Sequence, residues 1–287
     1  MDYLKVLRNN NKIAHKTFYI GTDKQLAADL TMRCVFTGNE KCSIGHRSLL
    51  LDSDSMLVLN KGTQYASCSG SEMPARSFAI SFDEKFVADF NRSVRLNSRQ
   101  LLDVQQNNGT LPELGETLYP FNGDLKLTVL HLKHHLDDGL DNELLINEYL
   151  HHCLITYHSL YNRQIYQKAE QLHILNRSTR IEMIRRLNLA REYLYSNFDR
   201  TIHLEQLADN SCLSVNHLLR TFKQAFGQTP HQYLTDIRLQ KARLMLKQTD
   251  CPVNEIVNTV GFENPSSFIR LFKKKMNTTP MAYRQSA

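Results

Sequence analysis

The chain has 287 residues, which is enough for about two domains of ordinary size. Apolar residues make up 41% of it and charged residues 22%, a globular balance that excludes a disordered or fibrous protein. There is no run of about 18 apolar residues and no apolar leader at the start, so we expect no membrane span, no signal peptide and a cytoplasmic location.

The net charge of +6 is distributed unevenly along the chain. Residues 176–287 contain 17 Lys and Arg against 9 Asp and Glu, whereas residues 1–175 contain 18 against 20. The balance is therefore +8 in the C-terminal part and −2 in the remainder. A polyanion is expected to bind the C-terminal part.

The first 90 or so residues show short apolar runs separated by turn residues, which indicates strands. The runs are 32–37, 48–51, 56–59 and 77–82, with polar turns at 52–54 and 60–62. This spacing predicts a small antiparallel sheet, barrel or jelly roll.

From residue 83 onward the pattern becomes helical, because apolar residues recur every three or four positions in 125–136 and from 142 to about 175. Part of the second run is apolar on several sides, which suits burial by another helix of the chain or by a second subunit. The residues concerned are Leu150, Leu154, Tyr157, Leu160 and Tyr161. We therefore predict a first domain at 1–175, whose segment at about 125–175 is buried within the chain or dimerises, and a second domain at 176–287 after a polar linker.

The second domain contains an internal repeat with an offset of 50 residues. Six identities carry it: Arg220 and Arg270, Phe222 and Phe272, Lys223 and Lys273, Thr229 and Thr279, Pro230 and Pro280, and Tyr233 and Tyr283. Two tandem copies of one helix-turn-helix unit follow, at about 204–227 and about 253–277. Ser214 and Asn264 are placed to cap the second helix of each copy.

That second helix has an apolar side in both copies. The apolar residues are Val215, Leu218, Leu219, Phe222 and Phe226 in the first copy, and Phe268, Ile269, Phe272 and Met276 in the second. The opposite side carries an arginine with small polar residues, which the major groove accepts because Arg can bind guanine with two hydrogen bonds. Lysines on the same side, Lys223, Lys273, Lys274 and Lys275, are expected to contact phosphates.

Residues 230–247 form a helical pattern between the two copies, with an expected length of about 27 Å. A rigid spacer of this length can hold two recognition helices roughly one duplex turn apart. One monomer is then expected to read two successive segments of the major groove.

Short motifs run through the segment from about residue 184 to 283. They include Ala190-Arg191-Glu192-Tyr193-Leu194, Leu213-Ser214, His217-Leu218-Leu219-Arg220-Thr221-Phe222-Lys223, Phe226-Gly227-Gln228-Thr229-Pro230, Val260-Gly261-Phe262 and Thr279-Pro280-Met281-Ala282-Tyr283-Arg284. With these motifs the segment, about a third of the chain, closely resembles the DNA-binding domain of the AraC/XylS family of bacterial transcription regulators. In that family the second helix of each unit enters the major groove. Together with the lysines, the resemblance implies the DNA-binding residues Asn216, Leu219, Arg220, Lys223, Ser266, Ser267, Arg270, Lys273 and Lys274.

Two positions depart from the family pattern. Asn277 stands where the family usually has Gly, and Asn is expected to keep the left-handed helix cap there. Asn258 stands where the family usually has Ala, and it either loosens the second unit or faces outward.

The N-terminal domain resembles family sensor domains through 54–62 and 77–82, which look like two pieces of a cupin-type barrel. Tyr65 stands where metal-binding cupins often have His, and no His-x-His occurs, so we expect no metal and no cofactor. Five histidines at helical spacing, His131, His134, His135, His151 and His152, would suit Zn²⁺ or Ni²⁺, but surface or partly buried positions are expected for them. The six scattered cysteines are expected to be reduced thiols.

The expected protein is thus an α+β multidomain chain, with a cupin-like β-barrel domain and central helices before an all-α double helix-turn-helix domain. We expect a sequence-specific transcription regulator, an effector-responsive activator by resemblance, with no catalytic residues. Its expected partners are double-stranded operator DNA, RNA polymerase, a small-molecule effector and a second copy of itself, and no membrane. The alternatives are a small-molecule-modifying cupin-type enzyme fused to a DNA-binding domain, and a general DNA-packaging protein.

Overall fold

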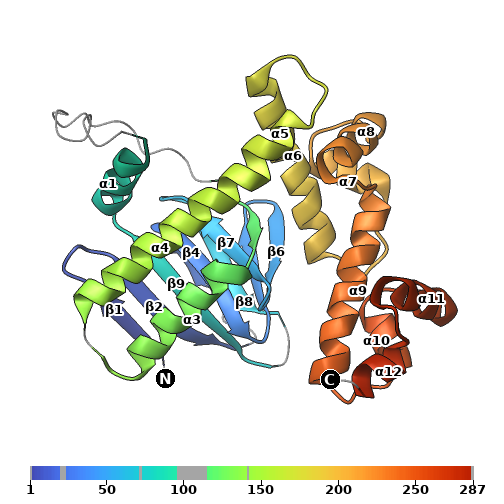
Figure 1. Cartoon of the computed structure of the whole chain (residues 1–287), viewed down its shortest axis with the longest axis horizontal. Helices are drawn as coiled ribbons and strands as arrows, with labels where there is room; N and C mark the ends of the chain where they lie inside the picture. Colours follow the sequence, from blue (N-terminus) through green and yellow to red (C-terminus); the bar gives the residue numbers. More distant parts are fainter. Residues whose placement is uncertain (1, 20–23, 71–72, 96–114, 141, 286–287) are drawn as a thin grey trace. The chain divides into compact units, whose positions relative to one another are not determined.

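The computed structural model describes residues 2–19, 24–70, 73–95, 115–140 and 142–285 (Figure 1). The chain divides into two compact units, Met1–Tyr166 and Gln167–Ala287, and the division precedes the polar linker predicted from the sequence. The first unit contains the strands and the second is helical, so the predicted α+β organisation is confirmed. No helix in the described parts of the chain is long and apolar enough to span a membrane.

Among the described residues of the N-terminal unit, ten antiparallel strands form two sheets. The larger sheet has the order β1 (Tyr3–Val6), β2 (Lys12–Phe18), β9 (Ala75–Phe82), β4 (Leu30–Thr37), β7 (Ser55–Leu59) and β10 (Leu118–Pro120). The smaller has the order β3 (Lys24–Ala27), β8 (Gln64–Ser69), β5 (Glu40–Ile44) and β6 (Arg47–Leu51). The described strands do not close into the barrel that the sequence suggested.

One face of the six-stranded sheet packs against helices. Its alternate residues on β4, β7 and β9 are apolar and buried: Met32, Cys34, Met56, Val58, Phe78 and Ile80. They share one core with side chains from α1 (Glu84–Arg95), α3 (Gly123–Asp137) and α4 (Glu143–Tyr161). Figure 1 shows α3 and α4 lying across this face.

The opposite face of the same sheet faces the four-stranded sheet and combines buried apolar residues, such as Leu57 and Leu59, with polar ones. Arg33 of β4 donates from Nε to Glu40 Oε1 of β5 at 2.6 Å, and both side chains are buried. Ser67 of β8 hydrogen-bonds to the same carboxylate oxygen. The space between the two sheets is therefore held partly by hydrogen bonds and charge rather than by apolar packing alone.

The residues that suggested dimerisation lie mostly inside the chain. Leu150, Leu154 and Tyr157 of α4 are buried in the sheet-and-helix core, and Leu160 and Tyr161 pack against it. The helical run predicted to about residue 175 continues beyond α4 as a π-helical segment (Asn162–Gln167) and the short α5 (Lys168–Glu170), and it ends at Glu170. Dimerisation remains a prediction.

In the described part of the second unit, α5 is followed by α6 (Arg177–Ser196), α7 (Leu204–Asn210), α8 (Val215–Phe226), α9 (Pro230–Gln248), α10 (Val253–Thr259), α11 (Pro265–Met276) and α12 (Pro280–Gln285). The pairs α7/α8 and α10/α11 occupy the segments predicted as helix-turn-helix units. The spacer is a single helix, α9, whose 19 residues give a length of roughly 28 Å.

Candidate nucleic-acid interface

Two helices, α8 and α11, present the polar faces that the sequence predicted. Each begins at the predicted cap: Ser214 accepts a hydrogen bond from the His217 N–H, and Asn264 accepts from the N–H groups of Ser266 and Ser267. These caps satisfy N–H groups that a helix start otherwise leaves without partners. The first residues of both helices, which would meet base edges first, are thereby fixed in place.

The scaffold behind these faces is repeated in three dimensions. The ring of Phe222 lies 5.6 Å from that of Tyr233, nearly edge-on at 82°, and the ring of Phe272 lies 5.6 Å from that of Tyr283 at 77°. Phe222 and Phe272 are fully buried. Burial raises the pKa of Tyr233, so its phenol remains neutral. The two copies related by the 50-residue offset therefore share a packing arrangement as well as sequence identities.

The turns of the two units differ in length. Four residues separate α7 from α8, and five separate α10 from α11. Cys212 has a φ of 52° in the first turn, and Gly261 has a φ of 82° in the second. A Cβ atom on Gly261 would lie 2.8 Å from backbone atoms of Phe198 and Asp199, so only glycine fits there.

The predicted DNA-binding residues form two corresponding faces. On α8, Asn216, Arg220 and Lys223 are exposed and Leu219 is half-buried. On α11 the exposed residues are Ser266, Arg270, Lys273 and Lys274, while Ser267 is half-buried. Arg220 and Arg270 occupy the same position of the repeat.

The cations on these faces have no partners within the described residues. Arg220, Lys223, Arg270, Lys273 and Lys274 make no ion pair or side-chain hydrogen bond there. The neighbouring Lys275 differs, since its ammonium lies 2.9 Å from Asp236 Oδ1 of α9. This contact joins α11 to the spacer helix, and the role of Lys275 at a phosphate stays a prediction.

Two positions on these faces were missed by the sequence reasoning. Ile269 was placed on the apolar side of α11, but its side chain is 42% exposed and lies beside Arg270. It corresponds to Leu219 through the 50-residue offset, and His217 corresponds in the same way to Ser267. Applying the offset to every predicted residue would have found both.

The two departures from the family pattern are accommodated. Asn277 ends α11 with a φ of 57°, which confirms the predicted left-handed cap. Asn258 is exposed on α10, so it faces outward and leaves the core of the second unit apolar.

The described residues include no group of three or more His, Cys, Asp or Glu side chains arranged to hold a metal ion. The helical histidines have separate contacts: His134 lies 3.5 Å from Asp138, and the ring of His151 lies 4.4 Å from that of Phe86. All six cysteines are free thiols.

The C-terminal segment is similar to known DNA-binding proteins. A family model described as "Helix-turn-helix domain" matches residues 207–286. The bifunctional transcriptional activator/DNA repair enzyme AdaA of Bacillus subtilis is 39% identical over 99 residues, which are 34% of this chain and 47% of AdaA. The transcriptional activator RhaS of Escherichia coli is 36% identical over 100 residues, which are 35% of this chain and 36% of RhaS.

Among solved structures, the C-terminal domain of AraT, a response regulator from Geobacillus stearothermophilus, is similar with 33% identity and a TM-score of 0.34. That likeness covers 36% of this chain and 85% of the other. The chain thus spans less than half the length of the two curated relatives, and the match to the family model lies in its C-terminal third. Within that third, the chain carries a helix-turn-helix domain of the AraC/XylS type.

Proposed function

We propose that this protein is a sequence-specific DNA-binding transcription regulator. The observation that carries the proposal is the pair of exposed faces on α8 and α11, which share one register and carry cations without partners among the described residues. A charged helix face is usually only a solvated surface. A solvated surface does not require the same charged face to recur at the same positions of two repeated units, so the repetition favours a binding role.

Each face combines side chains for base edges with side chains for phosphates. Arg220 and Arg270 are assigned to guanine, because a guanidinium can donate to both O6 and N7. Asn216, Ser266 and Ser267 are assigned to neighbouring base edges, and Leu219 to apolar contact with a thymine methyl group. Lys223, Lys273 and Lys274 are assigned to phosphates, where they add affinity that depends on salt.

Regulation is the wider part of the proposal. The relatives AdaA and RhaS are named as transcriptional activators, and this supports an activator that contacts RNA polymerase in the cytoplasm. The separate sheet unit supports an effector-binding role, and the exposed Leu127, Leu144 and Ile155 on α3 and α4 leave apolar surface for a second copy. The proposed regulator is therefore a homodimer whose N-terminal unit responds to a small molecule.

The test uses the full chain. A binding sequence is first selected from random duplex DNA, and affinities of Arg220→Ala and Arg270→Ala are then measured on it by fluorescence anisotropy. Each variant is expected to lose about 1–3 kcal/mol of binding free energy and to lose base preference at one position. Arg243→Ala is the matched control, since Arg243 is an exposed arginine on α9 and belongs to neither α8 nor α11.

Three outcomes would contradict the proposal. If Arg243→Ala loses as much binding free energy as the other two variants, the losses reflect general charge attraction and not base recognition. Unchanged affinity in both Arg220→Ala and Arg270→Ala would remove the assignment of the recognition helices. Equal affinity for selected and random DNA at physiological salt would favour DNA packaging instead.

A further inference from the structure

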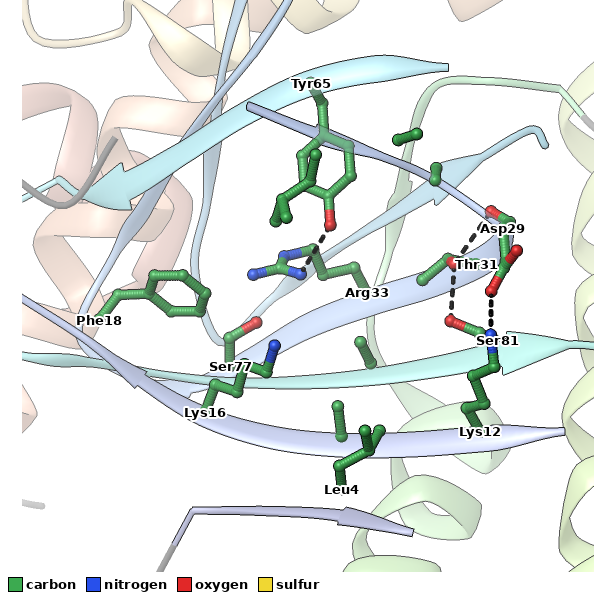
Figure 2. Close-up of a pocket in the computed structure, with 15 residues that line it drawn as sticks. Leu4, Lys12, Lys16, Phe18, Asp29, Thr31, Arg33, Tyr65, Ser77 and Ser81 are labelled. Carbon is green, nitrogen blue, oxygen red and sulfur yellow. Dashed lines mark hydrogen bonds and ion pairs between the residues drawn. The ribbon is translucent and has the colours of Figure 1, made fainter. Parts of the chain in front are cut away.

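A cavity of about 160 Å³ lies in the N-terminal unit, between its two sheets (Figure 2). Strands β1, β2, β9 and β4 of the six-stranded sheet form one wall, and β3 and β8 of the other sheet contribute the opposite one. An apolar cavity of about 150 Å³ is known to accept a molecule the size of benzene. The space is therefore suited to a small organic molecule.

Strand register explains why the space is hollow. Leu4 pairs with Ala14, Ala14 pairs with Ala79, and Ala79 pairs with Arg33, so these four residues form one row across four strands. They all line the cavity. Two adjacent alanines in the middle of the row leave room that larger side chains would fill.

One end of the cavity is cationic. Lys16 pairs with Ser77 in the next row, beside Arg33, and Figure 2 shows Lys16, Ser77 and Arg33 gathered on one side. The ammonium of Lys16 has no hydrogen-bond or ion-pair partner among the described residues. The Arg33 guanidinium is held in place by the rings of Phe18 and Tyr65, whose centroids lie 5.1 and 5.7 Å from it.

Arg33 retains a donor for a ligand. Its Nε donates to Glu40 and its Nη1 lies 3.5 Å from the Tyr65 hydroxyl oxygen, whereas Nη2 makes no hydrogen bond to a described residue. The Tyr65 hydroxyl accepts from Arg33 and can still donate its own hydrogen. Arg33, Tyr65 and Lys16 thus offer three donors at this end.

The opposite end is already satisfied. Lys12 Nζ lies 2.8 Å from Asp29 Oδ2, and the hydroxyls of Thr31 and Ser81 are 2.9 Å apart. Because these groups are paired with one another, they do not form a second charged subsite. Between the two ends the wall consists of the alanines and the exposed Leu4.

We propose that this cavity binds a small organic carboxylate with a compact apolar body. The carboxylate accepts hydrogen bonds from Arg33, Tyr65 and Lys16, because a charged acceptor suits converging donors that include two cations. The apolar body covers Ala14 and Ala79 and extends toward Leu4. The identification of this carboxylate as an effector rests on the proposed function, whereas its binding does not.

The test is isothermal titration calorimetry on the full chain with three probes. Cyclopentanecarboxylate is expected to bind with a Kd of about 1 mM or tighter. Cyclopentanecarboxamide has the same shape without charge, and inorganic phosphate has charge without an apolar body. Both are expected to bind at least about tenfold more weakly, which corresponds to 1.4 kcal/mol.

Variants locate the site. Lys16→Gln is expected to weaken cyclopentanecarboxylate binding about tenfold, whereas Lys12→Gln, on the same strand and already paired with Asp29, is expected to leave it within about twofold. Ala79→Leu is expected to abolish binding by filling the cavity. Since Ala79→Leu can also disturb folding, Lys16→Gln decides the placement, because Lys16 is exposed and supports no described contact.

Every outcome has a consequence. If cyclopentanecarboxylate does not bind, the proposal is wrong. If cyclopentanecarboxamide binds equally well, the site does not require an anion. If phosphate binds equally well, the site does not require an apolar body. Equal effects of Lys16→Gln and Lys12→Gln overturn the placement. Affinity for the selected DNA, measured on the same samples, separates the two ideas: DNA binding without carboxylate binding defeats only this inference, and the reverse defeats only the proposed regulator.

Discussion

The two helix-turn-helix units have the same scaffold but different turns and different outer faces. The rings of Phe222 and Tyr233 in the first unit, and of Phe272 and Tyr283 in the second, meet edge to face at the same centroid separation of 5.6 Å. The second turn is one residue longer, and α11 carries three consecutive lysines where α8 has one in its last turn. Close packing thus constrains the buried side of the unit, while the turn and the face exposed to solvent can diverge.

The largest expected effects would test whether the two scaffolds are energetically equivalent. Phe222→Ala and Phe272→Ala each remove a fully buried ring, and each is expected to lower the free energy of unfolding by about 3–5 kcal/mol. The loss combines the transfer of the ring with the cavity left behind. Urea denaturation followed by far-UV circular dichroism would measure it.

Ile269→Ala is the control for this pair, since Ile269 is apolar and on the same helix but 42% exposed. Its expected effect is within about 0.5 kcal/mol. A difference of more than about 2 kcal/mol between the two phenylalanine variants would show that the same ring geometry contributes unequally to stability in the two units.

The turns provide the next largest difference. Gly261→Ala is expected to destabilise the protein by at least about 2 kcal/mol, because alanine costs roughly 1–2 kcal/mol in the left-handed region and its Cβ would also press on the Phe198 and Asp199 backbone. Gly227→Ala has a similar φ of 72° but open space around the added Cβ, so only the smaller cost is expected. Thermal unfolding of both variants measures the contribution of crowding.

In the first unit, Cys212→Gly should behave in the opposite way. Cys212 has a φ of 52°, and glycine would relieve that strain while adding freedom to the unfolded chain. A change within about 1 kcal/mol is expected. A large loss would show that the Cys212 side chain, rather than its backbone, supports the turn.

Regular patterns made much of the fold predictable. Runs at 32–37, 48–51, 56–59 and 77–82 lie within β4, β6, β7 and β9, and the caps Ser214 and Asn264 fix the starts of α8 and α11. These features are local, since an apolar run or a capping side chain acts on residues within a few positions. The 50-residue repeat extended the same local rules to a second unit.

What could not be predicted depends on distant contacts. Strands β2 and β8 escaped notice because their buried positions include the polar His15 and Ser67, so their sequences do not give a regular apolar alternation. The pairing of Lys275 with Asp236 joins residues 39 positions apart, so its sequence looked like that of its neighbours. The exposure of Ile269 is set by where α11 packs and not by its own hydrophobicity.

A smaller effect separates lysines on the same helix. Lys273→Ala is expected to reduce the slope of log affinity against log salt by about 0.9, the value for one lost phosphate contact. Lys275→Ala is expected to change that slope by less, since Lys275 already pairs with Asp236. Titrations of the selected DNA at several salt concentrations would measure both, and equal changes in slope would place Lys275 on the DNA as well.

The smallest expected effect concerns Lys168, a partly buried lysine that packs against the first helix-turn-helix unit and has no counterpart among the described residues at the second. Lys168 of α5 lies 4.2 Å from the ring of Phe226, at the end of α8. Burial, and then the nearby charge of Arg191, lower its pKa from 10.5 to about 7. In the second unit, Met276 stands at the position that corresponds to Phe226. The lysine that contacts an aromatic ring there is the exposed Lys247, whose ammonium lies 5.2 Å from the centroid of the Tyr283 ring.

The sign of the pH effect follows from this lowered pKa. Between about pH 7 and 10.5 the unfolded chain holds a proton on Lys168 that the folded chain has released, so this residue makes stability rise with pH across that window and adds no slope below it. Contact with the Phe226 ring favours the ammonium form and reduces the size of the rise. Lys168→Met should flatten the increase in melting temperature between about pH 7 and 9.5, whereas Lys247→Met should leave the pH profile unchanged. Parallel profiles for the wild type and Lys168→Met would show that Lys168 stays charged against the ring, and the two units would then differ in packing but not in proton binding.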